Sequence, residues 1–169
     1  MVAGGATMRE VAAEMPAMII RYPRGIETLR ALTIEERTCI MPEVRVFWGP
    51  TGTGKTHSAK LWLPDAYTWE PSMGSWFQDY DGEEEVIFNE FRGQLPFGQM
   101  LDLLDKRPTK VAKKGGSCKF RGIKIAITSP VDPELWYPNK CADADSLNQL
   151  LRRITTITHC NIEYVASAC

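Results

Sequence analysis

The chain contains the eight residues Gly49-Pro50-Thr51-Gly52-Thr53-Gly54-Lys55-Thr56. This stretch fits the pattern G-x-x-x-x-G-K-[ST], which is typical of a phosphate-binding loop, or P-loop. The apolar and β-branched run at 44–48 precedes the loop and predicts a strand. The residues after Gly54 have a helical pattern through Trp62. The loop is therefore expected between a strand and a helix, which is the context that phosphate binding requires.

Each part of the loop has a physical reason for its residue type. Glycines allow backbone N–H groups to surround a phosphate, and a helix N-terminus adds favourable partial charge. Lys55 is expected to reach the β- and γ-phosphates, and the Thr56 hydroxyl is expected to bind Mg²⁺. We therefore predict a site for ATP and Mg²⁺ that is built from Gly49, Pro50, Thr51, Gly52, Thr53, Gly54, Lys55 and Thr56.

A second part of the site is expected at the end of another buried strand. The apolar run Val86-Ile87-Phe88 predicts that strand, and Asn89 and Glu90 follow it directly. A carboxylate at a strand tip can accept a proton from attacking water, so Glu90 is the predicted general base. Asn89 stands where a metal-associated Asp is expected, and we predict that Thr56, Asn89 and Glu90 together form the metal side of the site. The alternative for Glu90 is a solvated acid that follows the acidic run at 83–85.

The rest of the chain predicts an α/β fold. Further apolar runs predict strands at 123–128 and 154–158, and helical patterns lie at about 97–104 and 142–153. A hairpin is expected over 109–120, with Gly115-Gly116 at its tip. Strands that alternate with helices form a parallel central sheet covered by helices. We therefore predict one P-loop NTPase domain over residues 42–169.

Residues 1–41 are predicted to form a helical segment that serves in oligomerisation. Thr7 and Glu10 have the spacing of a capping box, and apolar residues follow at helical spacing until Pro23. A second helix is predicted over 26–34, before the chain enters the first strand.

The composition is that of a globular protein without membrane spans. Apolar residues make up 44% of the chain and charged residues 24%. No apolar run approaches the roughly 20 residues that span a bilayer. The N-terminus lacks the basic and apolar regions of a secretory signal. We expect an intracellular protein with no membrane partner.

Basic side chains are concentrated in residues 106–124. The formal net charge is −1, yet this stretch holds eight Lys and Arg and no acid, whereas the rest of the chain has 12 basic and 21 acidic residues. Such a strip attracts a polyanion, and lysines at a glycine tip can approach phosphates closely. We predict DNA contacts from Lys113, Lys114 and Lys119. The alternative is a solvated charged loop.

Several motifs occur together in the order and spacing of a known family. They are the P-loop, Tyr67-Thr68-Trp69-Glu70-Pro71 followed by Trp76, Gly82-Glu83-Glu84 leading into 86–91, Lys114-Gly115-Gly116, Ile127-Thr128-Ser129 and Arg152-Arg153-Ile154. On these motifs the chain, over about residues 7–160, resembles the helicase part of the replication initiator of circovirus-like single-stranded DNA viruses. The resemblance implies a superfamily 3 helicase with an AAA+-like core. It also implies a homo-oligomeric, usually hexameric ring that hydrolyses ATP, moves 3′ to 5′ on single-stranded DNA and works in the host nucleus.

The resemblance implies roles for individual residues. These roles are Walker A for Lys55 and Thr56, the Walker B acidic pair for Asn89 and Glu90, DNA contact for Lys114, the sensor for Ser129, and the arginine finger for Arg152 or Arg153. Two positions depart from the family pattern, since Asn89 replaces an acid and Pro130 replaces an amide. The first departure affects Mg²⁺ binding, and the second leaves the polar sensor role with Ser129 or Thr128.

Initiators of this family also carry an N-terminal nicking domain with a His-hydrophobe-His metal pair. The chain has only His57 and His159, so origin nicking is not expected from it. A small GTPase is disfavoured because Asp79, which would begin its D-x-x-G motif, does not follow a buried strand. Two rivals stay open: a small-molecule P-loop kinase that is indifferent to DNA, and an assembly subunit that binds ATP with little turnover.

Overall fold

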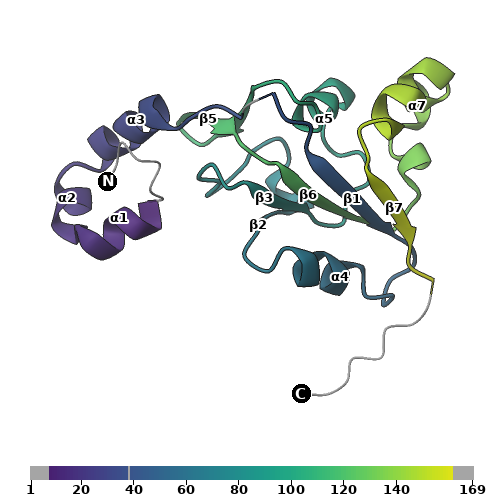
Figure 1. The fold of residues 1–169 in the computed structure, drawn as a ribbon, viewed down its shortest axis with the longest axis horizontal. Helices are drawn as coiled ribbons and strands as arrows, with labels where there is room; N and C mark the ends of the chain where they lie inside the picture. The colour runs from purple at the N-terminus through teal and green to yellow at the C-terminus, as the bar shows by residue number, and fades with distance from the viewer. Residues whose placement is uncertain (1–7, 38, 162–169) are drawn as a thin grey trace.

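The computed structural model describes residues 8–37 and 39–161. Its centre is a five-stranded sheet in the order β2-β3-β6-β1-β7, in which all neighbouring strands are parallel (Figure 1). The strands are β1 (Glu43–Trp48), β2 (Tyr67–Trp69), β3 (Glu85–Phe88), β6 (Lys124–Ser129) and β7 (Thr156–His159). The predicted α/β fold with a parallel central sheet is confirmed.

Helices cover both faces of this sheet. They are α4 (Lys55–Trp62), α5 (Phe97–Leu103), α6 (Pro138–Cys141) and α7 (Ala144–Leu151), with 3₁₀ turns η2 (Pro71–Met73) and η3 (Pro133–Leu135). In Figure 1, α4 lies on one side of the sheet and α5 and α7 lie on the other. Because both faces are covered, the central strands β3 and β6 are buried at nearly every position.

Successive side chains of each strand enter different layers, as the period of a strand requires. Ile87 and Ala126 pack with Ala59 of α4 and with Leu63, which directly follows that helix. The alternate positions of the same strands enter the larger core on the other face, together with α5 and α7. Buried aromatic rings fill much of that core, namely Trp69, Phe77, Tyr80, Phe88, Phe91, Phe120 and Trp136. These rings bury large areas and hold the β2–β3 edge of the sheet in place.

The predicted hairpin is confirmed. It consists of β4 (Thr109–Lys113) and β5 (Gly116–Phe120), which pair antiparallel and are separate from the central sheet. Its tip is Lys114-Gly115, one residue earlier than the predicted Gly115-Gly116, because Gly116 already pairs in β5. Gly115 has φ 89°, a conformation that favours glycine.

Three helices precede β1. They are α1 (Met8–Glu14), α2 (Pro16–Arg21) and α3 (Pro23–Thr33). In Figure 1 they lie apart from the sheet, beyond β5. The prediction of one helix up to Pro23 is wrong, because Pro16 has no N–H to continue a helix and begins a new one. The second predicted helix is confirmed as α3, and Thr7 of the proposed capping box lies outside the described residues.

Arg37 connects the helical segment to the domain. Arg37 is only 3% exposed, and its guanidinium lies 5.5 Å from the centre of the Phe120 ring. The guanidinium donates hydrogen bonds of 2.8–3.2 Å to the carbonyl oxygens of Leu103, Gly122, Asp102 and Arg107. Since these carbonyls flank the hairpin, Arg37 fixes the end of the helical segment against the hairpin base. In the part of the chain that the structure describes, no helix is long and apolar enough to cross a membrane.

Candidate active site

The P-loop lies at the carboxyl end of β1, between β1 and α4. The strand order reverses at β1, because β6, β3 and β2 lie on one side of it and β7 on the other. In open α/β sheets, ligands bind at the carboxyl ends of the strands at such a reversal. The residue before α4 is Gly54, whose φ of 77° directs the chain from the loop into the helix. The predicted context of the loop is therefore confirmed.

Gly49 is also required by the packing of β7. The backbone N–H of Cys160, just after β7, donates to the carbonyl oxygen of Trp48 at 2.7 Å. A Cβ atom on Gly49, whose φ is 143°, would lie 2.1 Å from the carbonyl oxygen of Cys160. Any side chain at this position would therefore displace either the loop or the end of β7.

Lys55 is folded back over the loop. The residue is 5% exposed, and its Nζ donates a hydrogen bond of 2.7 Å to the carbonyl oxygen of Pro50. Thr53 Oγ1 donates to the same oxygen at 2.8 Å. An ammonium group has three donors, so the contact with Pro50 orients Lys55 without using all of them. The ammonium group of Lys55 therefore lies against the loop that is expected to surround the phosphates.

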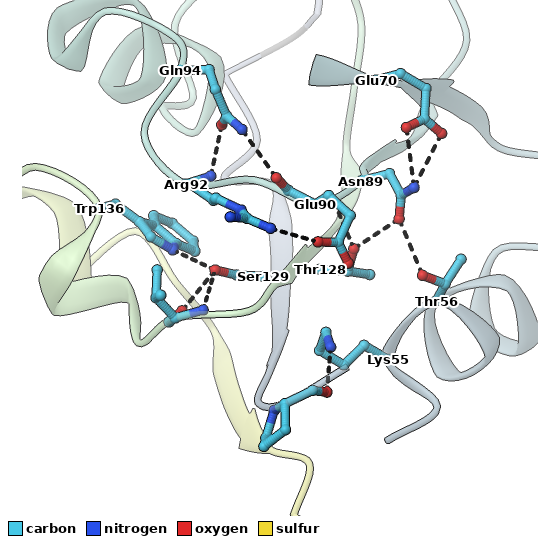
Figure 2. Close-up of polar contacts among 12 residues, drawn as sticks. Lys55, Thr56, Glu70, Asn89, Glu90, Arg92, Gln94, Thr128, Ser129 and Trp136 are labelled. Atoms are coloured by element: carbon cyan, nitrogen blue, oxygen red, sulfur yellow. Dashed lines mark hydrogen bonds and ion pairs between the residues drawn. The ribbon is translucent and has the colours of Figure 1, made fainter. Parts of the chain in front are cut away.

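Asn89 lies between the P-loop and β2, as Figure 2 shows. Its Oδ1 accepts hydrogen bonds from Thr56 Oγ1 at 3.1 Å and from Thr128 Oγ1 at 2.9 Å. Its Nδ2 donates to both carboxylate oxygens of Glu70 at 3.1 Å. The structure therefore brings Thr56 and Asn89 together, and it adds Glu70, which the sequence analysis did not place in the site. Hydroxyl, amide and carboxylate oxygens are the ligands that Mg²⁺ prefers, so these residues fit the ion.

Glu90 occupies a strained position at the tip of β3. Its φ of 49° is uncommon for any residue but glycine, and such strain clusters at functional sites. The backbone holds this conformation because the N–H of Glu90 donates to Thr128 Oγ1 at 3.0 Å and its carbonyl oxygen accepts from Gln94 Nε2 at 3.0 Å. The carboxylate lies 3.5 Å from the Arg92 guanidinium and is 40% exposed (Figure 2). Glu90 therefore combines a fixed backbone with a side chain that water can reach.

Thr128, rather than Ser129, contributes a hydroxyl to this site. Ser129 Oγ donates to the Val131 carbonyl at 2.7 Å and accepts from the Val131 N–H at 3.1 Å and from Trp136 Nε1 at 2.9 Å. These contacts use its one donor and both of its acceptor positions. The structure does not support the sensor assignment of Ser129, because its hydroxyl is committed to the core. The alternation of β6 gives the signal, since Ser129 shares a face with the core residue Ile127.

The two arginines after α7 differ in their surroundings. Arg153 is 9% exposed, and its guanidinium lies 2.6 Å from Asp105 Oδ2 and donates to the Gln149 carbonyl at 2.5 Å. Arg152 is exposed. Arg153 is therefore engaged inside its own chain, and only Arg152 presents a guanidinium to the surface.

The predicted DNA-contacting lysines also separate into two groups. Lys113 and Lys114 lie at the end of β4 and at the hairpin tip, and no acid within residues 8–37 and 39–161 forms an ion pair with either. Lys119 instead donates to the carbonyl of Ile34 at 2.8 Å and lies 3.9 Å from Glu36. Other basic residues of the strip pair with acids, namely Arg107 with Asp105, Arg121 with Glu84 and Lys124 with Glu85. Among the described residues, four lysines of the strip form no ion pair, and two of them, Lys113 and Lys114, lie side by side at the hairpin tip, whereas Lys106 and Lys110 lie nearer its base.

Comparison with known proteins agrees with the motifs. The chain is 36% identical over 162 residues to the replication-associated protein of beak and feather disease virus. This match covers 96% of the chain and 54% of the viral protein. The chain is a relative of the circovirus replication-associated proteins. The proteins of the same name from canary circovirus and porcine circovirus 1 are each 36% identical to it, over 153 and 149 residues. The resemblance stated from the motifs is therefore confirmed.

The chain spans about half the length of these curated relatives. No protein-family model matches the chain. Among solved structures, two chains of Hsp104 superpose with TM-scores of 0.44 and 0.43 at 14% and 15% identity, over 90% of this chain and 34% of theirs. Superpositions of this quality carry no argument, so the assignment of a P-loop NTPase core depends on the loop and the sheet described above.

Proposed function

We propose that this chain is the ATP-driven motor of a viral replication initiator, a helicase that hydrolyses ATP to move along single-stranded DNA. One observation carries the proposal: the P-loop residue Thr56 contacts Asn89, and Thr128 joins Asn89 to the backbone of Glu90. A phosphate-binding loop, oxygen ligands for a metal and a carboxylate that water can reach therefore meet at one end of the sheet. The relationship to replication-associated proteins supports the setting in DNA replication.

The residues of the site have distinct parts in hydrolysis. Lys55 places positive charge at the β- and γ-phosphates, where it stabilises the charge of the transferring group. Mg²⁺, when bound by Thr56 and Asn89, supplies further neutralisation of the phosphates. Glu90 accepts a proton from the attacking water, and Thr128 holds its backbone in place. The carboxylate must leave Arg92 for this step, and an ion pair at 3.5 Å with both partners exposed is weak enough to allow it.

Arg152 completes the site of a neighbouring subunit in this proposal. The family resemblance implies a homo-oligomeric, usually hexameric ring, and Arg152 is the exposed member of the arginine pair. A guanidinium that approaches the γ-phosphate of a neighbour contributes roughly 10³ to 10⁵ in rate in nucleotide hydrolases. Arg153 holds the end of α7 against Asp105 and in this way positions Arg152.

The hairpin tip is the proposed contact with DNA. Lys113 and Lys114 have no acidic partner in the described part of the chain, so they are available to backbone phosphates. Contacts with phosphates give affinity that does not depend on sequence, as a translocating motor needs. Movement in the 3′-to-5′ direction is proposed from the family resemblance alone.

The steady-state rate of phosphate release, with and without single-stranded DNA, tests the proposal. We expect Mg²⁺-dependent ATP hydrolysis that single-stranded DNA stimulates and that Lys55→Ala abolishes. Turnover that is indifferent to DNA, with phosphate transferred to a metabolite, would instead identify a small-molecule kinase. ATP binding without turnover under all conditions would identify an assembly subunit.

A further inference from the structure

Glu70 and Asn89 are neighbours because of the register of two parallel strands. Glu70 directly follows β2, and Asn89 directly follows β3. The register pairs Trp69 with Phe88, and the Asn89 N–H donates to the Trp69 carbonyl at 2.9 Å. The side chains of Glu70 and Asn89 therefore meet at the same edge of the sheet as the P-loop.

The chemistry of the carboxylate determines which way the Asn89 amide points. An ionised carboxylate only accepts hydrogen bonds, so the amide must turn its Nδ2 toward Glu70. Its carbonyl oxygen then faces the Thr56 and Thr128 hydroxyls, as Figure 2 shows. If the amide were reversed, its oxygen would lie against a negative charge. Glu70 therefore selects the orientation in which an oxygen is offered to the metal side of the site.

The backbone around Glu70 is rigid enough for this task. Trp69 is completely buried, and its indole N–H donates to the Gly74 carbonyl at 3.1 Å. The carbonyl oxygen of Glu70 accepts from the Met73 N–H at 2.9 Å, and Pro71 begins the 3₁₀ turn η2 directly after it. A buried ring on one side and a short helical turn on the other thus hold the carboxylate in place.

Within the described residues, no cation pairs with the charge of Glu70. Glu70 is half-buried, and among residues 8–37 and 39–161 no Lys or Arg forms an ion pair with it. Its partner is the neutral amide of Asn89. A carboxylate withdrawn from water without a cation is unfavourable. A divalent cation beside Thr56 would remove this cost, whereas a free triphosphate would increase it.

We propose that Glu70 is the positioning carboxylate of the Mg²⁺ site, and that it supplies the negative charge which Asn89 lacks. It orients Asn89 toward Thr56 and makes nucleotide binding depend on Mg²⁺, because it attracts the cation and repels free ATP. This inference rests on the proposed function, since it concerns the same ATP site.

Binding of a fluorescent ATP analogue across a series of Mg²⁺ concentrations, and in EDTA, tests this role without measuring turnover. In Glu70→Gln the side chain can still accept from Asn89 but has lost its charge. We expect the Mg²⁺ concentration for half-maximal binding to rise roughly 10-fold, the order of effect seen when a residue that orients a metal ligand is removed. Affinity in EDTA should stay unchanged or increase, because a charge that repels the phosphates is gone. Glu70→Ala should weaken Mg²⁺-dependent binding further, since the amide is then free to turn.

Two more variants separate charge from structure. Glu85→Gln is the matched control, because Glu85 lies at the other end of β3 in an exposed pair with Lys124; its Mg²⁺ dependence should equal that of the wild type. Asn89→Asp combined with Glu70→Gln reverses donor and acceptor and returns one charge to the pair. This double variant should recover most of the Mg²⁺ dependence, which a loss of folding could not explain.

The outcomes distinguish this inference from the proposed function. Equal Mg²⁺ dependence in the wild type and Glu70→Gln, or no recovery in the double variant, would overturn the role of Glu70 and leave the ATP site intact. Failure of the wild type to bind the analogue at any Mg²⁺ concentration would overturn both.

Discussion

The two arginines that follow α7 should respond very differently to the same substitution. Arg153 is 9% exposed and its guanidinium lies 2.6 Å from Asp105 Oδ2, whereas Arg152 is exposed. Arg153→Ala would leave the Asp105 carboxylate, which is 14% exposed, without this cation. Removal of one partner from a buried ion pair costs about 3 to 5 kcal/mol. Because both side chains keep some contact with water, we expect a loss of about 3 kcal/mol, at the lower end of that range.

Thermal unfolding measures this loss directly. For chains of 150 to 250 residues, 1 kcal/mol shifts Tm by about 2 to 4 °C, so Arg153→Ala should lower Tm by roughly 6 to 12 °C at pH 7. Arg152→Ala is the matched control and should change the free energy of unfolding by less than about 0.5 kcal/mol. Combining Arg153→Ala with Asp105→Ala should cost less than the sum of the single losses, since the two residues are in contact.

The pH dependence of the free energy of unfolding is a second test of the Arg153–Asp105 pair. Burial alone would raise the pKa of Asp105, but hydrogen bonds, that of Arg153 foremost, and the charge of Arg153 hold the pKa below its ordinary value of 3.8. A lowered folded-state pKa contributes stability at neutral pH that is lost as the pH falls through it. The difference between wild type and Arg153→Ala should therefore narrow below pH 3.8. Equal stability of Arg153→Ala and Arg152→Ala at pH 7 would refute the structural role of Arg153.

Three further experiments test the site and the hairpin. Lys55→Ala should abolish ATP turnover and leave the circular dichroism spectrum unchanged, because Lys55 belongs to neither hydrophobic cluster of the described residues and its ammonium donates to a loop carbonyl, that of Pro50. Retained turnover would contradict the P-loop assignment. Mixing Lys55→Ala with Arg152→Ala subunits, each inactive alone, should restore part of the ATPase rate if the site is shared between neighbours, and a fully active monomer would exclude sharing. The double variant Lys113→Glu, Lys114→Glu should bind single-stranded DNA more weakly. The slope of log affinity against log salt should also become smaller by roughly 0.7 per lost phosphate contact. An unchanged slope would show that the hairpin tip is a solvated loop that does not contact DNA.

Local patterns predicted most of the fold. The strands at 44–48 and 86–88, the loop between β1 and α4, and the glycine-tipped hairpin were all predicted because neighbouring residues determine each of them. The helical segment was predicted less well. Its apolar spacing continues through Pro16, and the missing N–H of that proline divides the helix where the spacing alone gives no sign.

The chemical groups of the site could be predicted from the residues alone: a P-loop lysine and threonine, an amide in place of an acid, and a glutamate at a strand tip. Which of these groups meet depends on the tertiary fold. The register of β2 and β3 placed Glu70 beside Asn89, the alternation of β6 directed Thr128 to the site and Ser129 to Trp136, and the end of α7 paired Arg153 with Asp105. The alternation within β6 is a local pattern, but residues distant in the chain become neighbours only through the order of the strands and the packing of the helices, so no local pattern encodes the contacts of Glu70 with Asn89 or of Arg153 with Asp105.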